Sequence, residues 1–338
     1  MKIVVMMSGG VDSSVCAALL KNQGHEVIGV TMRLSEANDC TADAGSSKTC
    51  CGISEAMLAR EVCKILGIKH IYKDFSKQFK TKVIDKFIQS YNDGLTPVPC
   101  SDCNDYIKFG DCLEYAINEL GADYVATGHY AQIIDGQLHK SQNTNKDQSY
   151  FLAGVNRNYI NKILFPIANL EKEEVRQIAR DYNLPVANKR ESMDICFAPN
   201  GYREFLQNNN VQIKNGPIYQ DGVKIGEHSG TQNYTYGQKL KGQFVTKIRA
   251  GDNIIEIGSR PKSKTVTLTE INYLVSTLPQ KTFKIRVRNR CEYDCRVVYH
   301  DHNMLILESE TDMLNLTPGQ SGVLYSDSLV LLKGTIVK

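Results

Sequence analysis

A short apolar strand that runs directly into a glycine-rich turn and then a helix limits the fold more than any other feature. Residues 2–7 read KIVVMM, residues 8–10 read Ser-Gly-Gly, and residues 11–22 have helical periodicity that ends before Gly24. Glycine lets the backbone bend tightly and approach a ligand, and the N–H groups at a helix start attract phosphate. The alternative is an ordinary turn in which a serine or aspartate only caps the helix. The order strand, turn, helix favours a nucleotide-binding α/β domain.

Further strands and helices alternate through the first half of the chain, which predicts a parallel sheet covered by helices. After a polar stretch at 208–216, short alternating segments separated by Gly and Pro predict an all-β region, a small barrel. We therefore expect three domains, at residues 1–205, 206–270 and 271–338. The expected strands of the first half lie at 27–32, 70–73 and 124–127, with a hairpin at 130–141, and the expected helices lie at 54–66, up to about 91, at 106–120 and at 171–182.

Charge and cysteine content narrow the class of protein. The net charge is +3, but residues 1–150 hold 15 Lys and Arg against 18 Asp and Glu, whereas residues 151–338 hold 25 against 19. This asymmetry indicates a polyanion bound by the C-terminal part, although ordinary scatter in composition would also produce it. No apolar run reaches the ~18 residues of a membrane span and no signal peptide precedes the first strand, so we expect a cytoplasmic protein without membrane contact. The 11 cysteines then serve as nucleophiles, sulfur carriers or metal ligands, or lie in the core.

The turn itself, SGGVDSS at residues 8–14, lacks the lysine of the phosphate loop in kinases and GTPases. It resembles the pyrophosphatase loop, or PP-loop, of enzymes that cleave ATP between the α- and β-phosphates. Asp12 would then hold Mg²⁺ or serve the helix start, and a carboxylate beside a polyphosphate favours the metal. Met32 and Gly128 lie at the ends of two other expected strands, where the ligands of open α/β sheets bind.

Two cysteine-containing segments carry the next signal. Cys100 and Cys103 follow the stiff segment 97–99, and Cys103 is expected at or near a helix start, where the helix dipole favours a thiolate. The two are a redox pair, two metal ligands or an incidental CxxC, and no second CxxC or His pair completes a zinc site. Cys196 is isolated among apolar residues, for which a buried structural cysteine is the default interpretation.

A basic strand is expected at residues 283–290, which read FKIRVRNR. Alternation with period two directs Phe283, Ile285 and Val287 to the core. The opposite face is a row of four cations that predicts contact with RNA phosphates, and the alternative is a solvated barrel face. This row consists of Lys284, Arg286, Arg288 and Arg290.

Seven strings, in this order, resemble the tRNA-specific 2-thiouridylases of the MnmA type, PP-loop enzymes that thiolate the wobble uridine (anticodon position 34) of certain tRNAs. The similarity runs over essentially the whole chain. It implies ATP-dependent adenylation of the uridine 2-carbonyl oxygen, sulfur transfer from a cysteine persulfide, and AMP as the leaving group. For the three predicted domains, the resemblance implies an ATP-binding catalytic PP-loop domain, a connecting domain and a tRNA-binding barrel, in that order. The strings are SGGVDSS (8–14), TGHYA (127–131), KDQSYFL (146–152), DICF (194–197), GEHSG (226–230), YTYGQK (234–239) and PGQ (318–320).

The resemblance also implies a role for each site residue. The counterpart of Cys196 receives sulfur as a persulfide from a donor protein, either a cysteine desulfurase or a relay protein, and the counterpart of Cys103 attacks that persulfide. Contacts with ATP are implied for Met6, Met7, Ser8, Gly9, Gly10, Val11, Asp12, Ser13, Met32 and Gly128. Contacts with tRNA are predicted, from the resemblance or from the basic strand, for Val98, Pro99, Cys100, His129, Lys146, Asp147, Gln148, Lys284, Arg286, Val287, Arg288 and Gln320.

The chain departs from the family pattern at four positions. Cys100 stands where many relatives carry Asp, while Val98 replaces an Asn, Met193 a Gln and Val287 a Tyr. Three cysteines at 100, 103 and 196 leave open a [4Fe–4S] cluster, but we favour a dithiol relay that needs only the latter two, because such clusters are usually held by four cysteines. Rival functions are a PP-loop amide-forming ligase and a non-catalytic RNA- or iron–sulfur-binding protein.

Overall fold

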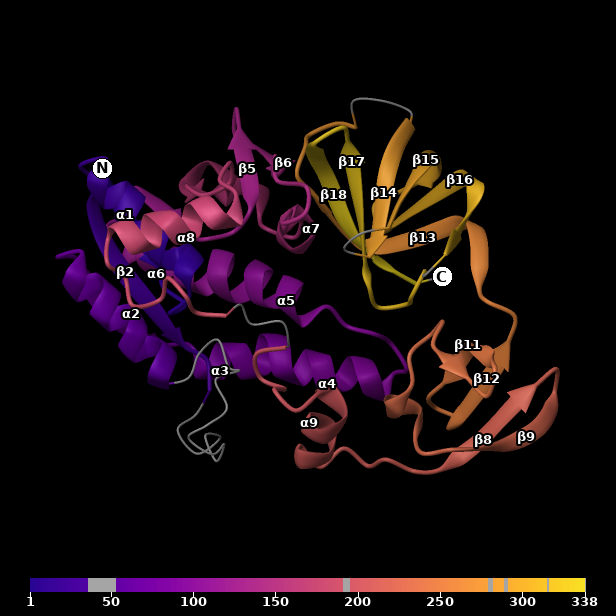
Figure 1. Cartoon of the computed structure of the whole chain (residues 1–338). Helices are drawn as coiled ribbons and strands as arrows, with labels where there is room; N and C mark the ends of the chain where they lie inside the picture. The colour runs from indigo at the N-terminus through magenta and orange to yellow at the C-terminus, as the bar shows by residue number, and fades with distance from the viewer. Residues whose placement is uncertain (36–52, 191–194, 279–281, 289–290, 315, 338) are drawn as a thin grey trace. The chain divides into compact units, whose positions relative to one another are not determined.

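The computed structural model describes residues 1–35, 53–190, 195–278, 282–288, 291–314 and 316–337 (Figure 1). Two compact units make up the chain. The N-terminal unit contains Met1–Val83 and Cys100–Pro199, and the C-terminal unit contains Ile84–Pro99 and Asn200–Lys338. Residues 84–99 thus leave the first unit and join the second, which no local sequence pattern indicated. The three predicted domain ranges stay predictions.

The N-terminal unit is built on a five-stranded parallel sheet with the strand order β3-β2-β1-β4-β7. The chain adds β2 and β3 on one side of β1 and then crosses over to place β4 and β7 on the other side. Ligands of open α/β sheets bind where the order reverses, beyond the carboxyl ends of the strands, and here that point lies between β1 and β4. The strands are β1 (Lys2–Met6), β2 (Glu26–Arg33), β3 (Lys69–Asp74), β4 (Tyr124–Ala126) and β7 (Ile163–Leu164).

Two helices frame the turn that follows β1. Helix α1 (Val11–Asn22) has the predicted bounds, and its first residues come directly after the glycines. Helix α8 (Lys172–Asp181) packs against α1 (Figure 1) and shares its apolar core. A capping box of Glu171 and Glu174 fixes the residue at which α8 begins. Helix α2 (Ile53–Ile65) packs against β2 and β3.

The helix predicted at 106–120 begins earlier and is not a regular α-helix. It starts as α5 (Pro99–Asp102), continues as the π-helix η3 (Cys103–Cys112) and ends as α6 (Leu113–Asn118). Stretches of π-helix are rare and occur frequently at functional sites. The helix predicted up to residue 91 is likewise divided, into α3 (Ser76–Phe79), the π-helix η2 (Lys80–Ile84) and α4 (Asp85–Asn92).

The predicted hairpin is confirmed as β5 (Ala131–Ile134) and β6 (Gln137–Lys140). Its turn residues Asp135 and Gly136 both have positive φ, which a tight two-residue hairpin turn requires. The remaining short elements of this unit are α7 (Ser149–Leu152) and the 3₁₀-helix η4 (Arg157–Lys162).

The C-terminal unit contains a small sheet with the order β10-β11-β12-β8-β9. In the same unit, Tyr91 of α4 stacks on Tyr202 of α9 (Tyr202–Asn208) with ring centroids 4.7 Å apart, and Phe87 contacts Phe205 edge to face. These ring contacts hold residues 84–99 within this unit. The strands are β8 (Gly216–Gln220), β9 (Val223–His228), β10 (Lys239–Leu240), β11 (Gln243–Arg249) and β12 (Ile254–Gly258), and the 3₁₀-helix η5 (Thr231–Asn233) lies between β9 and β10.

The last part of the chain closes into a six-stranded antiparallel barrel, which confirms the predicted barrel (Figure 1). Its order is β13-β16-β15-β14-β17-β18, and β13 also pairs with β18 to complete the ring. The strands are β13 (Lys262–Tyr273), β14 (Thr282–Arg288), β15 (Cys291–His300), β16 (Met304–Leu314), β17 (Ser321–Ser326) and β18 (Leu329–Ile336). Within the described ranges, no helix has the length and apolar character needed to cross a membrane.

Candidate active site

The turn between β1 and α1 depends on one of its two glycines. Gly9 has a φ of +69°, and a Cβ added to it would lie 2.4 Å from the backbone oxygen of Glu55. Gly10 has a φ of −100°, and a Cβ there would meet only the Ser8 hydroxyl, at 3.4 Å. The backbone therefore requires glycine at position 9 but not at position 10.

Serine side chains brace this turn from within. Ser13 Oγ accepts a hydrogen bond from Ser8 N and donates to the Gly10 carbonyl, both at 3.2 Å, and Ser14 Oγ donates to the same carbonyl at 2.8 Å. The first N–H groups of an α-helix lack partners within the helix. The start of α1 thus offers backbone donors and the positive end of the helix dipole to an anion.

Gly128 brings the carboxyl end of β4 onto the start of α1. A Cβ on Gly128 would lie 2.6 Å from the carbonyl carbon of Asp12 and 2.7 Å from the Ser13 nitrogen, so the close approach requires glycine. The two segments that flank the switch point of the sheet are therefore in contact. Of the other predicted ATP contacts, Met32 is partly buried, and the side chains of Met6, Met7 and Val11 are buried in the core.

A lysine that the sequence analysis did not assign to this site holds Asp12. Lys172, the first residue of α8, donates to both carboxylate oxygens of Asp12, at 2.7 and 2.9 Å, and the Tyr130 hydroxyl donates to one of them at 3.3 Å. The sequence predicted Mg²⁺ beside Asp12. In this structure the positive charge beside Asp12 is the ammonium group of Lys172. A lysine in the first turn of a helix opposes the helix dipole, and this is the sequence signal that could have revealed Lys172.

A second lysine, which the sequence analysis did not assign to this site, binds the backbone of the turn. Lys189 Nζ donates to the Gly9 carbonyl at 3.0 Å and pairs with Glu55 at 3.2 Å. Glu55 is only 5% exposed, and its other carboxylate oxygen accepts the Ser54 hydroxyl at 2.6 Å. Lys189 thus links the turn to the start of α2.

His129 lies in a chain of polar contacts that leads to the residue beside Cys103. Thr127 Oγ1 is 2.8 Å from Nδ1 of His129, and Lys108 Nζ is 3.5 Å from Nε2. Lys108 also donates to the side-chain oxygen of Asn104 at 2.8 Å. Burial, and after it the Lys108 ammonium, holds the pKa of His129 well below its usual range, so the imidazole is neutral at pH 7. The neutral imidazole of His129 therefore carries no positive charge for an RNA phosphate.

Asp147, a predicted tRNA contact, has a largely buried carboxylate. Asp147 is 8% exposed, and its carboxylate accepts hydrogen bonds from Ser141 N at 3.0 Å, Ser149 N at 3.2 Å and Ser149 Oγ at 2.9 Å. The side chain therefore holds its own loop. The Gln148 amide oxygen likewise accepts a backbone hydrogen bond at 3.0 Å, and Lys146 is partly exposed.

The three cysteines of the predicted chemistry differ in exposure. Cys100 is exposed, Cys103 is 9% exposed and Cys196 is partly exposed; Asp194 of the same string lies outside the described residues. Because the helix begins at Pro99, Cys103 lies beyond its first turn, which corrects the expected position, and Cys100 takes the place that the dipole favours. Among the residues that the structure describes, no three His, Cys, Asp or Glu side chains form a group that could hold a metal ion.

Other cysteines lie in the core, as expected. Cys16, Cys63 and Cys112 are buried in the N-terminal unit and Cys295 in the barrel. Burial raises the pKa of the Cys63, Cys112 and Cys295 thiols to about 12, and that of Cys16 further. These thiols are protonated at pH 7 and therefore poor nucleophiles.

In the C-terminal unit, Gln320 fixes the segment that leads to the cysteines. Its Nε2 donates to the carbonyls of Thr96 at 3.1 Å and Pro97 at 3.3 Å, and Thr96 N donates to the Pro318 carbonyl at 2.9 Å. Further along this segment, Val98 is partly exposed and Pro99 is buried. Gln320 thus positions a backbone segment, which is a role that the sequence did not reveal.

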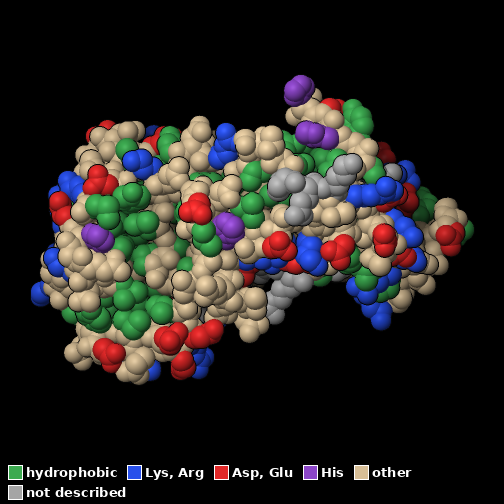
Figure 2. All heavy atoms as spheres, turned by 90° about the horizontal axis from the view of Figure 1, so that it is seen from above, with side chains coloured by type: hydrophobic (Ala, Val, Ile, Leu, Met, Phe, Trp, Pro, Cys, Tyr) green, Lys and Arg blue, Asp and Glu red, His purple; other side chains and the backbone are tan. Residues whose placement is uncertain are grey.

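The predicted alternation of apolar and basic residues along β14 is confirmed. The basic residues, however, are not a row of cations that all lack partners. The apolar residues at 283, 285 and 287 are buried in the barrel core, so the Val287 side chain cannot meet RNA there. On the other face, Lys284 pairs with Asp294 at 3.2 Å. Arg290 lies outside the described residues. On the face drawn in Figure 2, blue and red side chains are intermixed over the C-terminal unit.

The two arginines of β14 have different environments. Arg286 is 8% exposed, donates to Glu292 Oε1 from Nε at 2.9 Å and from Nη2, and lies 4.8 Å over the Tyr325 ring. Arg288 donates to Thr317 Oγ1 at 2.7 Å, and no described carboxylate pairs with it. Within the barrel the charge of Arg286 is balanced by Glu292, and its contact with a phosphate stays a prediction.

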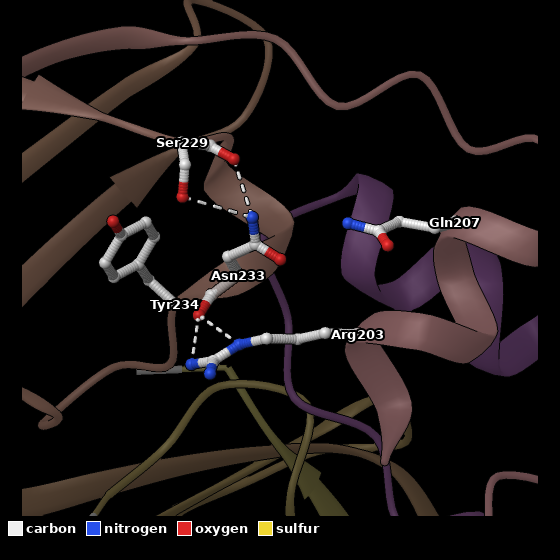
Figure 3. A pocket seen from close by; sticks show the side chains of 5 residues that line it. All are labelled: Arg203, Gln207, Ser229, Asn233 and Tyr234. Carbon is white, nitrogen blue, oxygen red and sulfur yellow. Dashed lines mark hydrogen bonds between the residues drawn. The ribbon is translucent and has the colours of Figure 1, made fainter. Parts of the chain in front are cut away.

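A cavity of about 250 Å³ lies elsewhere in the C-terminal unit (Figure 3). Arg203 donates to the Asn233 carbonyl from Nε at 3.2 Å and from Nη2 at 2.8 Å, and Asn233 in turn donates to Ser229. Gln207 and Tyr234 complete its lining. None of the predicted site residues lines this cavity, and its polar groups bind one another.

A parallel sheet whose switch point carries a glycine turn, a second close-packed glycine and two lysines defines a nucleotide-binding α/β enzyme domain. Comparison with known families is more specific. Residues 1–200 match a family model described as "tRNA methyl transferase HUP domain", and residues 263–336 match one described as "Aminomethyltransferase beta-barrel domain". The chain belongs to the tRNA-specific 2-thiouridylase family, on the full-length similarities that follow.

Three curated relatives carry that name. The chain is 40% identical to tRNA-specific 2-thiouridylase MnmA 1 of Syntrophus aciditrophicus, over 99% of this chain and 92% of that protein. It is 35% identical to MnmA of Pseudothermotoga lettingae (100% and 99%) and 37% identical to MnmA of Leptospira interrogans (99% and 94%). Among solved structures, a 4-thiouridine synthetase–RNA complex with bound ATP matches 61% of this chain and 50% of that chain at 16% identity and a TM-score of 0.36, too low to support an inference.

Proposed function

We propose that this protein is a tRNA sulfurtransferase that replaces the 2-carbonyl oxygen of the wobble uridine by sulfur at the expense of ATP. Family membership over the whole chain supports the activity, since the relatives are 2-thiouridylases. The observation that carries the proposal is the contact between Gly128 and the start of α1, because it places the backbone donors of the turn and of the first turn of α1 at the switch point.

The backbone donors at the switch point suit ATP. Backbone N–H groups at the turn and at the first turn of α1 would bind phosphate oxygens, and Gly9 and Gly128 allow the close backbone packing that holds those donors in place. Asp12 would hold Mg²⁺, which commonly takes one or two carboxylates and completes its shell with phosphates and water. The bound ATP supplies an AMP leaving group for an oxygen that would not otherwise depart.

Sulfur transfer would follow on the cysteines. A donor protein would load Cys196 as a persulfide, whose terminal sulfur displaces AMP from the adenylated base. The Cys103 thiolate would then attack the Cys196 sulfur, releasing the thiolated base and leaving a disulfide that an external thiol reduces. In the other order, Cys103 attacks the persulfide first and frees sulfide as the nucleophile. Partial exposure of Cys196 suits loading by a protein, and the two-cysteine route needs no metal group.

The activity is tested by tRNA-dependent release of AMP from ATP, together with mass spectrometry of wobble nucleosides from cells that lack the protein. We expect AMP release only with tRNA, and loss of 2-thiouridine derivatives in those cells. AMP release with ammonia and a small carboxylic acid instead would indicate an amide-forming ligase. Unchanged wobble nucleosides would refute the proposal.

On the barrel, Arg286→Gln and Arg288→Gln are expected to have different effects. The first removes one partner of the Arg286–Glu292 ion pair, and breaking a buried ion pair costs about 3–5 kcal/mol, here nearer the lower value because Glu292 is partly exposed. The second should lower the slope of log K for tRNA against log salt by about one unit. Thermal unfolding and a salt series of tRNA binding measure the two effects. An unchanged salt slope in Arg288→Gln would remove Arg288 from the RNA surface.

A further inference from the structure

The glycine-rich turn contains no cationic side chain, yet two lysines from later in the chain reach it. Lys189 is bound to the Gly9 carbonyl and to Glu55, so its charge is used to hold the turn. Lys172 is different, because its Nζ binds the carboxylate of Asp12, the residue at the mouth of the predicted phosphate site. Its side chain keeps 16% exposure and that of Asp12 29%, so both can be reached by a ligand.

The position of Lys172 is unfavourable for the helix that carries it. It is the first residue of α8, where the dipole is positive and where acidic residues are favoured, as Glu173 and Glu174 in the same turn show. Asp12 is the second residue of α1. The first turns of two helices and one ammonium group thus lie within side-chain reach of a single carboxylate. The N–H groups at these two helix starts and the ammonium group of Lys172 are the donors that could bind a phosphate group here.

We propose that Lys172 is the phosphate-binding lysine of this site. Without nucleotide its ammonium neutralises Asp12, and with ATP it moves to a β- or γ-phosphate oxygen, which leaves Asp12 available to a divalent cation. The four-carbon stem of lysine permits this exchange without movement of α8. Lys189 remains a positioning residue that keeps the Gly9 peptide in place. This inference rests on the proposed function, since it names a further ligand of the same ATP site.

The test is the binding of two nucleotides, measured by calorimetry with Mg²⁺ and without turnover. α,β-Methylene-ATP carries the β- and γ-phosphates, and AMP does not. Lys172→Met should weaken binding of the ATP analogue by about 10- to 100-fold, the loss expected for a hydrogen bond to a charged group, and leave AMP binding unchanged. Lys172→Arg should retain part of the affinity. Lys64→Met, an exposed lysine of α2, is the matched control and should bind both as the wild type does.

A double variant separates phosphate binding from simple neutralisation of Asp12. In the Asp12→Asn background, Lys172→Met should again weaken binding of the analogue by about 10- to 100-fold. If Lys172 served only to neutralise Asp12, Lys172→Met would have no further effect in that background. Equal loss of AMP and analogue binding, or an unaltered analogue affinity, would overturn the inference. Should Lys172→Met not fold, Lys172→Gln is measured in the same way. A wild-type protein that binds neither nucleotide would instead refute the proposed function.

Discussion

Replacing Gly9 with alanine should abolish tRNA-dependent AMP formation. The new Cβ would lie 2.4 Å from the Glu55 backbone oxygen, and no side-chain rotation can relieve a collision between backbone and Cβ. The turn must therefore move away from α2, and a displacement of about 1 Å at a catalytic site costs on the order of 100-fold in rate. Nucleotide binding and AMP release are the measurements, and tRNA binding should persist.

Gly67→Ala is the matched control for this variant. Gly67 has a φ of +62°, close to that of Gly9, but no atom lies within 4 Å of an added Cβ. An alanine at position 67 would lower the free energy of unfolding by about 1–2 kcal/mol, because its backbone is left-handed, but it would collide with no neighbouring atom. Gly67→Ala should therefore unfold at a lower temperature but keep its activity. If Gly9→Ala bound ATP normally, the turn would be only a structural connection.

Cys196→Ser and Cys103→Ser should each eliminate thiolation, at different stages. Without the Cys196 thiol, the protein should not acquire a persulfide from a donor. Without the Cys103 thiol, it should acquire the persulfide but fail to release a thiolated product, since no second thiolate resolves the intermediate. Mass spectrometry of the protein follows sulfur loading, and nucleoside analysis follows transfer. Cys291→Ser, a partly exposed cysteine of the barrel, controls for the loss of a thiol elsewhere.

Cys100→Ser separates the relay from a cluster mechanism. In the relay its serine variant should still load and transfer sulfur after anaerobic purification. A cluster on the three cysteines would make Cys100 as necessary as the other two and the activity dependent on iron. A brown protein that loses activity with Cys100→Ser would therefore contradict the relay.

Local periodicity was sufficient for much of the fold. Helix α1 has its predicted bounds, and the core-facing residues of β14 alternate as expected, because both patterns depend on neighbours in sequence. The partners of Arg286 and Asp12 could not be predicted in this way. Glu292 faces Arg286 through the register of β14 and β15, and Lys172 lies 160 residues from Asp12. Such contacts are fixed by tertiary packing, and composition showed only that opposite charges were available.

The parts of the candidate site that depend on close backbone packing were the parts that the sequence could locate. The glycine turn and Gly128 could be located from strand ends, because only glycine fits such close approaches. The surroundings of Cys103 could not, because a π-helix begins there and has no distinct sequence signal, although Pro99 at the first helical position is a recognised sign of a helix start.

Residues 84–99 have a consequence for how the protein is made. On the ribosome, Phe87 and Tyr91 emerge long before Phe205 and Tyr202, the rings that they contact, so their aromatic surface stays uncovered while the second half of the N-terminal unit is translated. The hydrogen bonds of Thr96 and Pro97 form later still, because their partners are Pro318 and Gln320. A nascent chain that stops at residue 200 would thus lack these ring contacts, a form open to aggregation until α9 has been synthesised.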